Sequence, residues 1–198
     1  GAHGTSHKYV SQQAIEMLGN PKESRIIVCH LGNGASVSAV QDGKCIDTSM
    51  GFTPLAGVMM GTRSGDVDPS VIDYLIEEVG LDMKEVIKML NKESGLLGVS
   101  GVSSDFRDIE GAAAKGDEKA QVALDAYAQR VKKYIGSYAA EMNGVDAVVF
   151  TAGVGENDKV TRKNVCEYLG YLGVKIDDEA NNVRGERRII SAPDSKVK

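Results

Sequence analysis

Two histidines near the start of the sequence have a type and spacing that could bind a metal ion or line a cleft. His3 and His7 stand four residues apart in the segment His-Gly-Thr-Ser-His. The pair is a poor zinc site, because Gly4 weakens a helical register and no third ligand lies nearby. A helix start capped by Ser6, with one or both imidazoles facing a cleft, and an ordinary surface turn both remain open.

A lone cation is the second chemical signal. Arg63 lies in the loop 51–68, which contains four glycines. Loops this rich in glycine usually approach another group closely. The planar guanidinium can bind a phosphate or a carboxylate with two parallel hydrogen bonds. A structural ion pair with Asp66 or Asp68 is the alternative.

A glycine-bearing turn joins two short apolar segments at residues 26–30 and 35–40. The connecting residues are Leu31-Gly-Asn-Gly34, and Asn-Gly supports the positive φ of a hairpin turn. The tip would expose backbone N–H groups with no bulky side chain in the way, which suits a phosphate. An ordinary hairpin turn is the alternative.

A second glycine-bearing junction lies at 145–157. Its run of Val and Phe is too short for a globular helix and lacks alternation, so it predicts a strand buried on both faces. The strand leads through Gly153 and Gly155 into a new helix, whose first N–H groups would be unpaired. From the residues alone, a phosphate cradle and a plain packing turn both remain open.

The elements that must position these residues alternate between strands and helices. A meander of three antiparallel strands opens the domain, and Asp42-Gly43 makes its second turn. Pro69 starts a helix, with an apolar face at 71–79, and a second helix has inward residues at 83–90. The fold class is therefore α/β with a mixed sheet. The other expected elements are a helix at 8–18, a break at 95–101, a helix from 103–107, a long helix at 117–142, a helix at 160–169 and a strand at 187–191.

Composition narrows the class of protein. The chain has 198 residues, of which 42% are apolar and 26% charged, and its net charge is -5. An acidic chain without a basic cluster is not expected to bind nucleic acid. No apolar run of about 18 residues predicts a membrane span. The three cysteines, Cys29, Cys45 and Cys166, are widely spaced and odd in number, which indicates a reducing, cytoplasmic compartment.

Five motifs, in order along the whole chain, resemble the acetokinase family. They are His-Gly-Thr-Ser-His at 3–7, His-Leu-Gly-Asn-Gly at 30–34, Gly-Thr-Arg-Ser-Gly-Asp-Val-Asp-Pro at 61–69, Ser-Asp-Phe-Arg at 104–107 and Gly-Val-Gly-Glu-Asn at 153–157. The resemblance implies the ribonuclease H-like ATPase domain of the acetate and sugar kinase, Hsc70 and actin superfamily. It also implies reversible phosphoryl transfer between ATP and acetate, with Mg²⁺ whose ligands are expected outside this chain.

The resemblance assigns a role to each motif. Arg63 would neutralise charge on the transferring phosphoryl group, and His3 would hydrogen-bond it; such a transfer needs positioning and charge compensation more than covalent help. The hairpin turn would hold the ATP phosphates, and two further segments would contact the nucleoside and close the adenosine pocket. The residues of these three segments are His30, Leu31, Gly32, Asn33 and Gly34; Asp105, Phe106 and Arg107; and Gly153, Val154, Gly155, Glu156 and Asn157.

The family also implies how the chain is organised. Residues 1–198 are expected to be one nucleotide-binding domain, the C-terminal half of a two-domain kinase that forms homodimers through this domain. Gly1-Ala2 is expected to be a cloning remnant, since Ala2 stands where the family has Phe. Alone, the chain is expected to be an inactive half-enzyme that binds ATP or ADP weakly, because catalysis needs both walls of the cleft.

Three other functions are kept as alternatives. The first is a propionate or butyrate kinase of the same fold. The second is a non-catalytic nucleotide-binding or dimerisation module, with Met59 and Met60 as residues that would probe a binding surface. A dehydrogenase with a Rossmann fold is the weakest, because the first strand turns back through Gly-Asn-Gly instead of opening a Gly-x-Gly-x-x-Gly helix.

Overall fold

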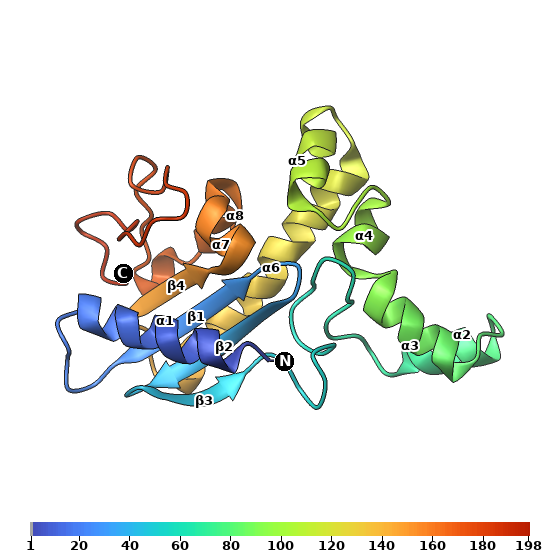
Figure 1. Cartoon of the computed structure of the whole chain (residues 1–198), viewed down its shortest axis with the longest axis horizontal. Coiled ribbons are helices and arrows are strands. Elements are labelled where there is room, and N and C mark those ends of the chain that lie inside the picture. The colour runs from blue at the N-terminus through green and yellow to red at the C-terminus, as the bar shows by residue number, and fades with distance from the viewer. Residues whose placement is uncertain (1) are drawn as a thin grey trace.

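A computed structural model describes residues 2–198, so the expectation for Gly1 lies outside it. It contains a four-stranded sheet in the order β3-β2-β1-β4 (Figure 1). β1 pairs antiparallel with β2 and parallel with β4, which confirms the expected mixed sheet and its opening meander. The strands are β1 (Arg25–Leu31), β2 (Ala35–Gln41), β3 (Lys44–Thr48) and β4 (Ala147–Thr151).

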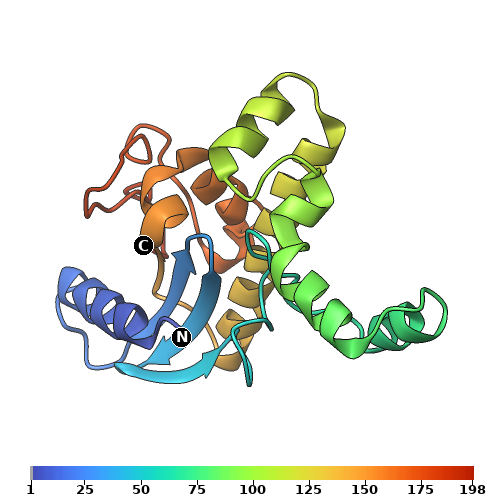
Figure 2. The same cartoon turned by 45° about the vertical axis from the view of Figure 1, so that its right-hand side comes forward.

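Helices cover both faces of this sheet. Figures 1 and 2 show α1 on one face and the long α6 on the other, while α2 and α3 reach away from the sheet. The helices are α1 (Gly4–Met17), α2 (Ser70–Glu77), α3 (Met83–Lys92), α4 (Gly95–Ser100), α5 (Phe106–Ala114), α6 (Glu118–Glu141), α7 (Ala152–Asn157) and α8 (Lys159–Cys166), followed by a 3-10 turn at Gly170–Leu172.

The core consists of two layers separated by the sheet. Successive residues of β1 point to opposite faces, so Ile26 and Val28 pack under α1 whereas Ile27 and Cys29 pack under α6. The expected stripe of α6 is confirmed, with Leu124 partly buried and the rest buried. The buried members are Tyr127, Val131, Ile135, Tyr138 and Met142.

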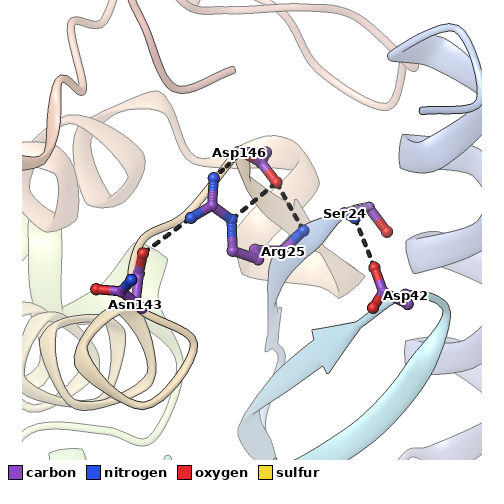
Figure 3. A network of polar contacts seen from close by, with 5 residues as sticks. All are labelled: Ser24, Arg25, Asp42, Asn143 and Asp146. Carbon is purple, nitrogen blue, oxygen red and sulfur yellow. Dashed lines mark hydrogen bonds and ion pairs between the residues drawn. The ribbon is translucent and has the colours of Figure 1, made fainter. Parts of the chain in front are cut away.

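An ion pair fixes where β4 meets β1. The backbone N–H and Nε of Arg25 donate to Asp146 Oδ2 at 2.7 and 3.2 Å, and Nη2 donates to Oδ1 at 2.8 Å (Figure 3). Nη1 donates to the carbonyl of Asn143 at 2.8 Å. These contacts hold the start of β1 against the turn that precedes β4, and they agree with the parallel pairing of Ile26 with Ala147.

Several expectations for single elements are wrong. The first helix begins at Gly4 instead of residue 8, and no side chain caps it, Ser6 included. Residues 95–100 form α4 instead of a break. Residues 187–191 form no strand; Ser191 makes one isolated bridge, with Ile176. β4 is an edge strand with a half-buried middle, and of residues 2–198 only Lys198 hydrogen-bonds along its outer side.

The expected apolar face of α2 is not buried. Val71 and Val79 are exposed, and no residue of α2 is buried. In α3 only Val86 and Leu90 are buried, whereas Met83 and Ile87 are exposed. Helical spacing correctly predicts that one side of a helix is apolar, but it does not say whether a partner covers that side. By contrast, the candidate probes of a binding surface are core residues: Met59 is 7% and Met60 is 0% exposed.

Candidate active site

His3 is placed by an unusual backbone conformation. It is the residue before α1 and has φ 60°, in the left-handed region that non-glycine residues rarely adopt. Its ring stacks on that of His30, with centroids 3.9 Å apart, and its Nδ1 lies 2.8 Å from Ser36 Oγ. Left-handed backbone in a non-glycine residue is uncommon and is often found at functional sites.

His7 is buried beneath His3 and touches two serines of β2. Its Nε2 lies 2.7 Å from Ser36 Oγ, and its Nδ1 lies 2.6 Å from Ser38 Oγ. His30 Nδ1 contacts Ser6 Oγ at 2.9 Å, so all three histidines of the chain meet here. Sequence reasoning missed both β2 serines. The signal was available, because Ser36 and Ser38 alternate along β2 and therefore share one face.

The cluster keeps its imidazoles neutral at pH 7. Burial, and then the neighbouring His30, lower the pKa of His3 to about 4. The same two causes, in the same order, lower the pKa of His7 to about 4. The pKa of His30 is also lowered by burial, although the Glu156 carboxylate opposes that shift. Neutral imidazoles each carry one N–H donor and one bare nitrogen.

The hairpin tip lies between His3 and Arg63. A Cβ on Gly34 would sit 3.1 Å from Arg63 Nη2 and 3.6 Å from His3 Nε2, so both side chains converge over this glycine. A Cβ on Gly61 would sit 2.2 Å from Asn33 Oδ1, and the Gly61 N–H donates to the Asn33 carbonyl. Glycine at these two positions therefore permits the close approach of the 51–68 loop to the tip.

Two donors at the tip are not used by the protein. Within residues 2–198, the N–H groups of Asn33 and Gly34 have no acceptor, whereas Gly32 N–H donates to the Gly34 carbonyl. Leu31 is buried in the core, so it contributes only main chain. Adjacent free N–H groups beside a cation form a setting that favours an anion.

Arg63 is not engaged in the structural ion pair that was the alternative. Its Nη1 donates to the Pro54 carbonyl at 2.8 Å, and no ion pair with Asp66 or Asp68 forms. Asp66 instead accepts from the Gly57 N–H at 2.8 Å and from the Tyr134 hydroxyl at 2.5 Å. The aspartate thus anchors the loop to α6 and leaves the guanidinium free to face the hairpin tip.

The junction after β4 begins next to the same tip. Ala152, the first residue of α7, has φ 67°, and its Cβ lies 3.7 Å from where a Cβ on Gly32 would be. The first N–H of α7 is already paired, because Glu156 accepts from Ala152 N–H at 3.0 Å and from Thr151 Oγ1 at 2.9 Å. The expectation of a fully unpaired helix start is therefore wrong.

The glycines of α7 play different parts. Gly155 is buried, and a Cβ there would sit 3.3 Å from the Phe150 carbonyl carbon, so this glycine serves packing. Gly153 is exposed and has open space around it, so a ligand can reach its backbone. Val154 packs against the core, and Asn157 Nδ2 donates back to the Gly153 carbonyl at 2.9 Å.

Residues 105–107 lie at the start of α5, which begins at Phe106. Asp105 caps the helix by accepting from Arg107 N–H at 2.9 Å, and it also binds the Arg107 guanidinium. Hydrogen bonds from Arg107 lower the pKa of Asp105 to about 2. Phe106 is buried edge-to-face on Tyr127, so its ring is turned into the core. The Arg107 side chain, 85% exposed, keeps an open face.

A hollow lies next to the histidine cluster and α7. It has a volume of about 680 Å³ and is lined by α1, the outer side of β4 and residues 183–190. Ser6 and Glu156 connect it to the histidine cluster and to α7. Within residues 2–198, no group of three or more His, Cys, Asp and Glu side chains could hold a metal ion. In the same part of the chain, no helix combines the length and apolar character needed to cross a membrane.

The fold is the α/β fold of the actin, Hsc70 and sugar kinase type, with the hairpin tip, Arg63 and the β4–α7 junction at one end of the sheet. The chain belongs to the Acetokinase family, whose sequence model matches residues 1–198.

The chain is also similar in sequence and structure to individual kinases. The chain is 60% identical over 199 residues to an acetate kinase of Clostridioides difficile, covering 100% of this chain and 50% of that one. It superposes on a crystal structure of Porphyromonas gingivalis acetate kinase with a TM-score of 0.95 and 52% identity, over 98% of this chain and 49% of that one. It superposes on a crystal structure of a propionate kinase from Francisella tularensis with a TM-score of 0.92 and 48% identity, over 99% of this chain and 50% of that one. The chain spans about half the length of the curated relatives it matches.

Proposed function

We propose that the protein carrying this chain transfers a phosphoryl group between ATP and acetate, giving acetyl phosphate and ADP. The observation that carries the proposal is the convergence of Arg63 and His3 over Gly34. A phosphoryl group at the hairpin tip would meet a cation, an imidazole and free backbone N–H groups. The similarity to proteins named acetate kinase supports the same reaction.

The site suits this chemistry because little covalent help is needed. The transferred group passes through a loose transition state in which charge spreads over its equatorial oxygens. The fixed charge of Arg63 would compensate that charge, and His3 Nε2 would hydrogen-bond an equatorial oxygen. The N–H groups of Asn33 and Gly34 would hold the neighbouring phosphates, with His30 beneath them as the stacking partner of His3.

Two segments form the proposed nucleoside side of the site. Residues 105–107 would contact the nucleoside through the exposed guanidinium of Arg107, whose planar face can stack on a base. Residues 153–157 would close the adenosine pocket, with the open backbone at Gly153 nearest the ligand. Glu110 of α5 lies near Asp158 after α7, because the Asp158 carboxylate contributes to raising the pKa of Glu110, so the helices that carry the two segments are close together here.

The proposed reaction uses Mg²⁺, but the described residues do not provide a set of ligands for it. Within residues 2–198, no cluster of three or more metal-binding side chains occurs. The hydroxyls, amides and imidazoles at the hairpin tip are not the carboxylate sets that Mg²⁺ prefers. We therefore assign no step of the transfer to the metal.

A longer acid is the second candidate substrate. The propionate kinase structure matches this chain nearly as well as the acetate kinase structure does, with TM-scores of 0.92 and 0.95. Arg63 and His3 act on the phosphoryl group, which acetate, propionate and butyrate would all accept, so these residues do not discriminate between the acids. Comparing kcat/KM of the full-length protein on the three acids would separate the candidates.

We further propose that residues 1–198 form the nucleotide-binding, C-terminal domain of a cytoplasmic, two-domain, homodimeric kinase. An exposed free thiol at Cys45 suits a reducing compartment. Exposed apolar side chains along α2 and α3 offer a surface that a second copy would cover. Sedimentation of the Met83→Glu protein tests this: a dimer that persists unchanged would exclude that surface.

Replacing Arg63 tests the reaction most directly. In the full-length protein, Arg63→Ala should lower kcat for acetyl phosphate formation by about 10³-fold or more. Arg130→Ala is the matched control, because Arg130 contacts the Asp66 carbonyl of the same loop without facing Gly34. Full activity in Arg63→Ala, or equal losses in both variants, would reject the assignment. If the unaltered protein has no kinase activity and Arg63→Ala loses nucleotide binding, the non-catalytic nucleotide-binding module is favoured.

A further inference from the structure

Four side chains, two from β2, one from α1 and that of His3 before α1, form one hydrogen-bonded row that ends at His3. Ser38 Oγ lies 2.6 Å from His7 Nδ1, and His7 Nε2 lies 2.7 Å from Ser36 Oγ. Ser36 Oγ then lies 2.8 Å from His3 Nδ1. Ser36, Ser38 and His7 are 0, 1 and 5% exposed, so their protons must be satisfied inside the protein.

Ser36 could accept from both histidines, but its own buried hydroxyl proton would then have no acceptor, since its Oγ has no other partner within residues 2–198. With both imidazoles neutral, two arrangements therefore remain, in which Ser36 accepts from one histidine and donates to the other. In the first arrangement His7 carries its proton on Nε2 and donates to Ser36, which donates to His3 Nδ1. His3 then carries its proton on Nε2, the atom that faces Gly34. In the second arrangement every bond is reversed, and His3 Nε2 is bare.

The hydroxyl of Ser38 decides between them. In the first arrangement it donates to His7 Nδ1, and no proton in the row is left over. In the second it must accept from His7, and its own proton has no acceptor within residues 2–198. A buried donor without a partner is costly, because it loses its bonds to water and gains none.

A neighbouring charge acts in the opposite sense. The Arg63 guanidinium also faces Gly34, and a cation favours a bare nitrogen on His3. Both Arg63 and His3 are partly exposed, so solvent screens this interaction, whereas Ser38 is almost fully buried. The buried hydroxyl therefore has the larger influence.

We propose that Ser38, His7 and Ser36 form a proton-ordered row that holds His3 as a neutral Nε2–H donor facing the hairpin tip. His7 is thus a positioning residue that acts through His3. The row itself follows from the geometry, while the identity of the acceptor, an oxygen of the transferring phosphoryl group, rests on the proposed function. A donor fixed before the ligand arrives needs no reorganisation during the transfer.

The tautomers can be observed directly by NMR on the chain labelled with ¹⁵N-histidine. The sequence has three histidines and all lie in this cluster, so every imidazole signal reports on it. Long-range ¹H–¹⁵N spectra at neutral pH should show His3 and His7 protonated on Nε2, with His3→Asn and His30→Asn assigning the three patterns. A proton on Nδ1 of His3 would overturn the proposal.

Serine variants test whether the order is transmitted along the row. Ser38→Ala, which keeps the strand residue small, should give mixed tautomers at His7 and at His3. Ser38→Thr retains the hydroxyl and should restore the single pattern. Ser6→Ala is the matched control: it removes the partner of His30 and should leave His3 and His7 unchanged. Unaltered His3 and His7 patterns in a folded Ser38→Ala chain would refute the row, and the unsubstituted spectrum stays decisive if that variant does not fold.

Kinetics of the full-length protein then separate the two proposals. Ser38→Ala should lower kcat by about tenfold while KM for ATP stays within about twofold, since a donor used in the transition state is weakened. An unaltered kcat would exclude transmission to the reacting group. A protein with no kinase activity would refute the proposed function, and the spectra would still decide the proton order.

Discussion

The terminal nitrogen Nη2 of Arg63 lies 3.1 Å from the point at which a side chain on Gly34 would begin. The φ of Gly34 is not in the left-handed region, so the backbone itself would accept alanine. A side chain there would crowd the guanidinium, whereas the His3 ring, 3.6 Å from the same point, would be in ordinary van der Waals contact with it. Glycine at the tip is thus required by the site rather than by the turn.

Gly34→Ala should therefore impair the site more than the fold. The new methyl group would displace Arg63, the flexible neighbour, so we expect unfolding stability within about 1 kcal/mol of the unaltered protein. A misplaced cation should lower kcat of the full-length protein about 10- to 100-fold. Urea unfolding and acetyl phosphate assays measure the two effects.

A second glycine provides the control for that substitution. Gly111 lies inside α5 with open space at its Cβ position, so Gly111→Ala should be stabilising by about 0.5–1 kcal/mol and leave activity unchanged. If Gly34→Ala kept full activity, the convergence of Arg63 and His3 would have no catalytic meaning.

The buried histidines should make the chain lose stability in mild acid. Their folded pKa values of about 4 lie below the ordinary 6.5, so the unfolded chain binds more protons between these values. The contribution of these two histidines to stability is thus fully present above pH 6.5 and falls as the pH drops toward 4. Denaturant titrations at several pH values should show this fall beginning above the range in which carboxylates titrate.

His7→Gln isolates one histidine's share. Removing one group that the unfolded chain protonates should flatten the dependence of unfolding free energy on pH, by about 1.4 kcal/mol per pH unit near pH 5.5. The variant will be less stable overall, but the slope does not depend on that loss. An unchanged slope would mean that His7 takes up its proton in the folded state.

Glu110 should produce the opposite dependence. Burial and the neighbouring Asp158 carboxylate raise the pKa of Glu110 to about 7, from an ordinary value of 4.5. Between these values the folded chain binds one proton more than the unfolded chain. The contribution of Glu110 to stability is therefore fully present below pH 4.5 and is lost as the pH rises through 7. Glu110→Gln keeps a donor toward Asp158 and should be more stable than the unaltered chain at pH 8, by about 1 kcal/mol after solvent screening.

The comparison at two pH values makes this prediction specific. At pH 5 the Glu110 carboxyl is already protonated, so the glutamine variant should match the unaltered chain. Glu77→Gln, at an exposed position in α2, should show no such difference between the two conditions. If the stability difference between Glu110→Gln and the unaltered chain were the same at both pH values, a proton shared between Glu110 of α5 and Asp158 before α8 would be excluded.

Local sequence patterns predicted the parts of the site that a few neighbouring residues determine. The glycine-bearing turn between two apolar segments correctly predicted a hairpin, although neither Asn33 nor Gly34 has the positive φ expected of an Asn-Gly turn. The spacing of Tyr127, Val131 and Ile135 correctly predicted the buried side of α6. Both elements could be predicted because strand alternation and helix spacing are patterns among residues that are close in the sequence.

Contacts between distant segments were beyond such reasoning. His3 has a left-handed φ and hydrogen-bonds Ser36, which is 33 residues away in the sequence, and such a contact cannot be found from neighbouring residues. Phe106 was expected to contact the nucleoside together with Asp105 and Arg107, but its ring is buried against Tyr127 of α6. The apolar face expected on α2 failed in the opposite direction: Ile72, Leu75 and Ile76 are only partly buried, and no residue of this helix is fully buried.

Arg162 is a distant contact of the same kind, and it holds the adenosine side of the proposed site. It is 2% exposed; its Nε donates to Asn181 Oδ1 at 2.7 Å and its Nη1 to the Gly155 carbonyl at 3.0 Å. Its Nη2 donates to the carbonyls of Asn181 and Val183 at 2.7 and 3.0 Å. One buried cation thus ties α7 to the loop after the 3-10 turn.

Arg162→Leu should cost about 3–5 kcal/mol of unfolding free energy, because it leaves two buried carbonyls, a partly buried carbonyl and a buried side-chain amide without their donor. The adjacent Lys163→Leu is the control: its ion pair with Asp178 is exposed and should be worth less than about 1 kcal/mol. In the full-length protein the first variant should also weaken ATP binding, measured by the thermal shift at millimolar nucleotide, because Gly155 loses its anchor. Equal stability of the two variants would show that Arg162 does not hold α7 in place.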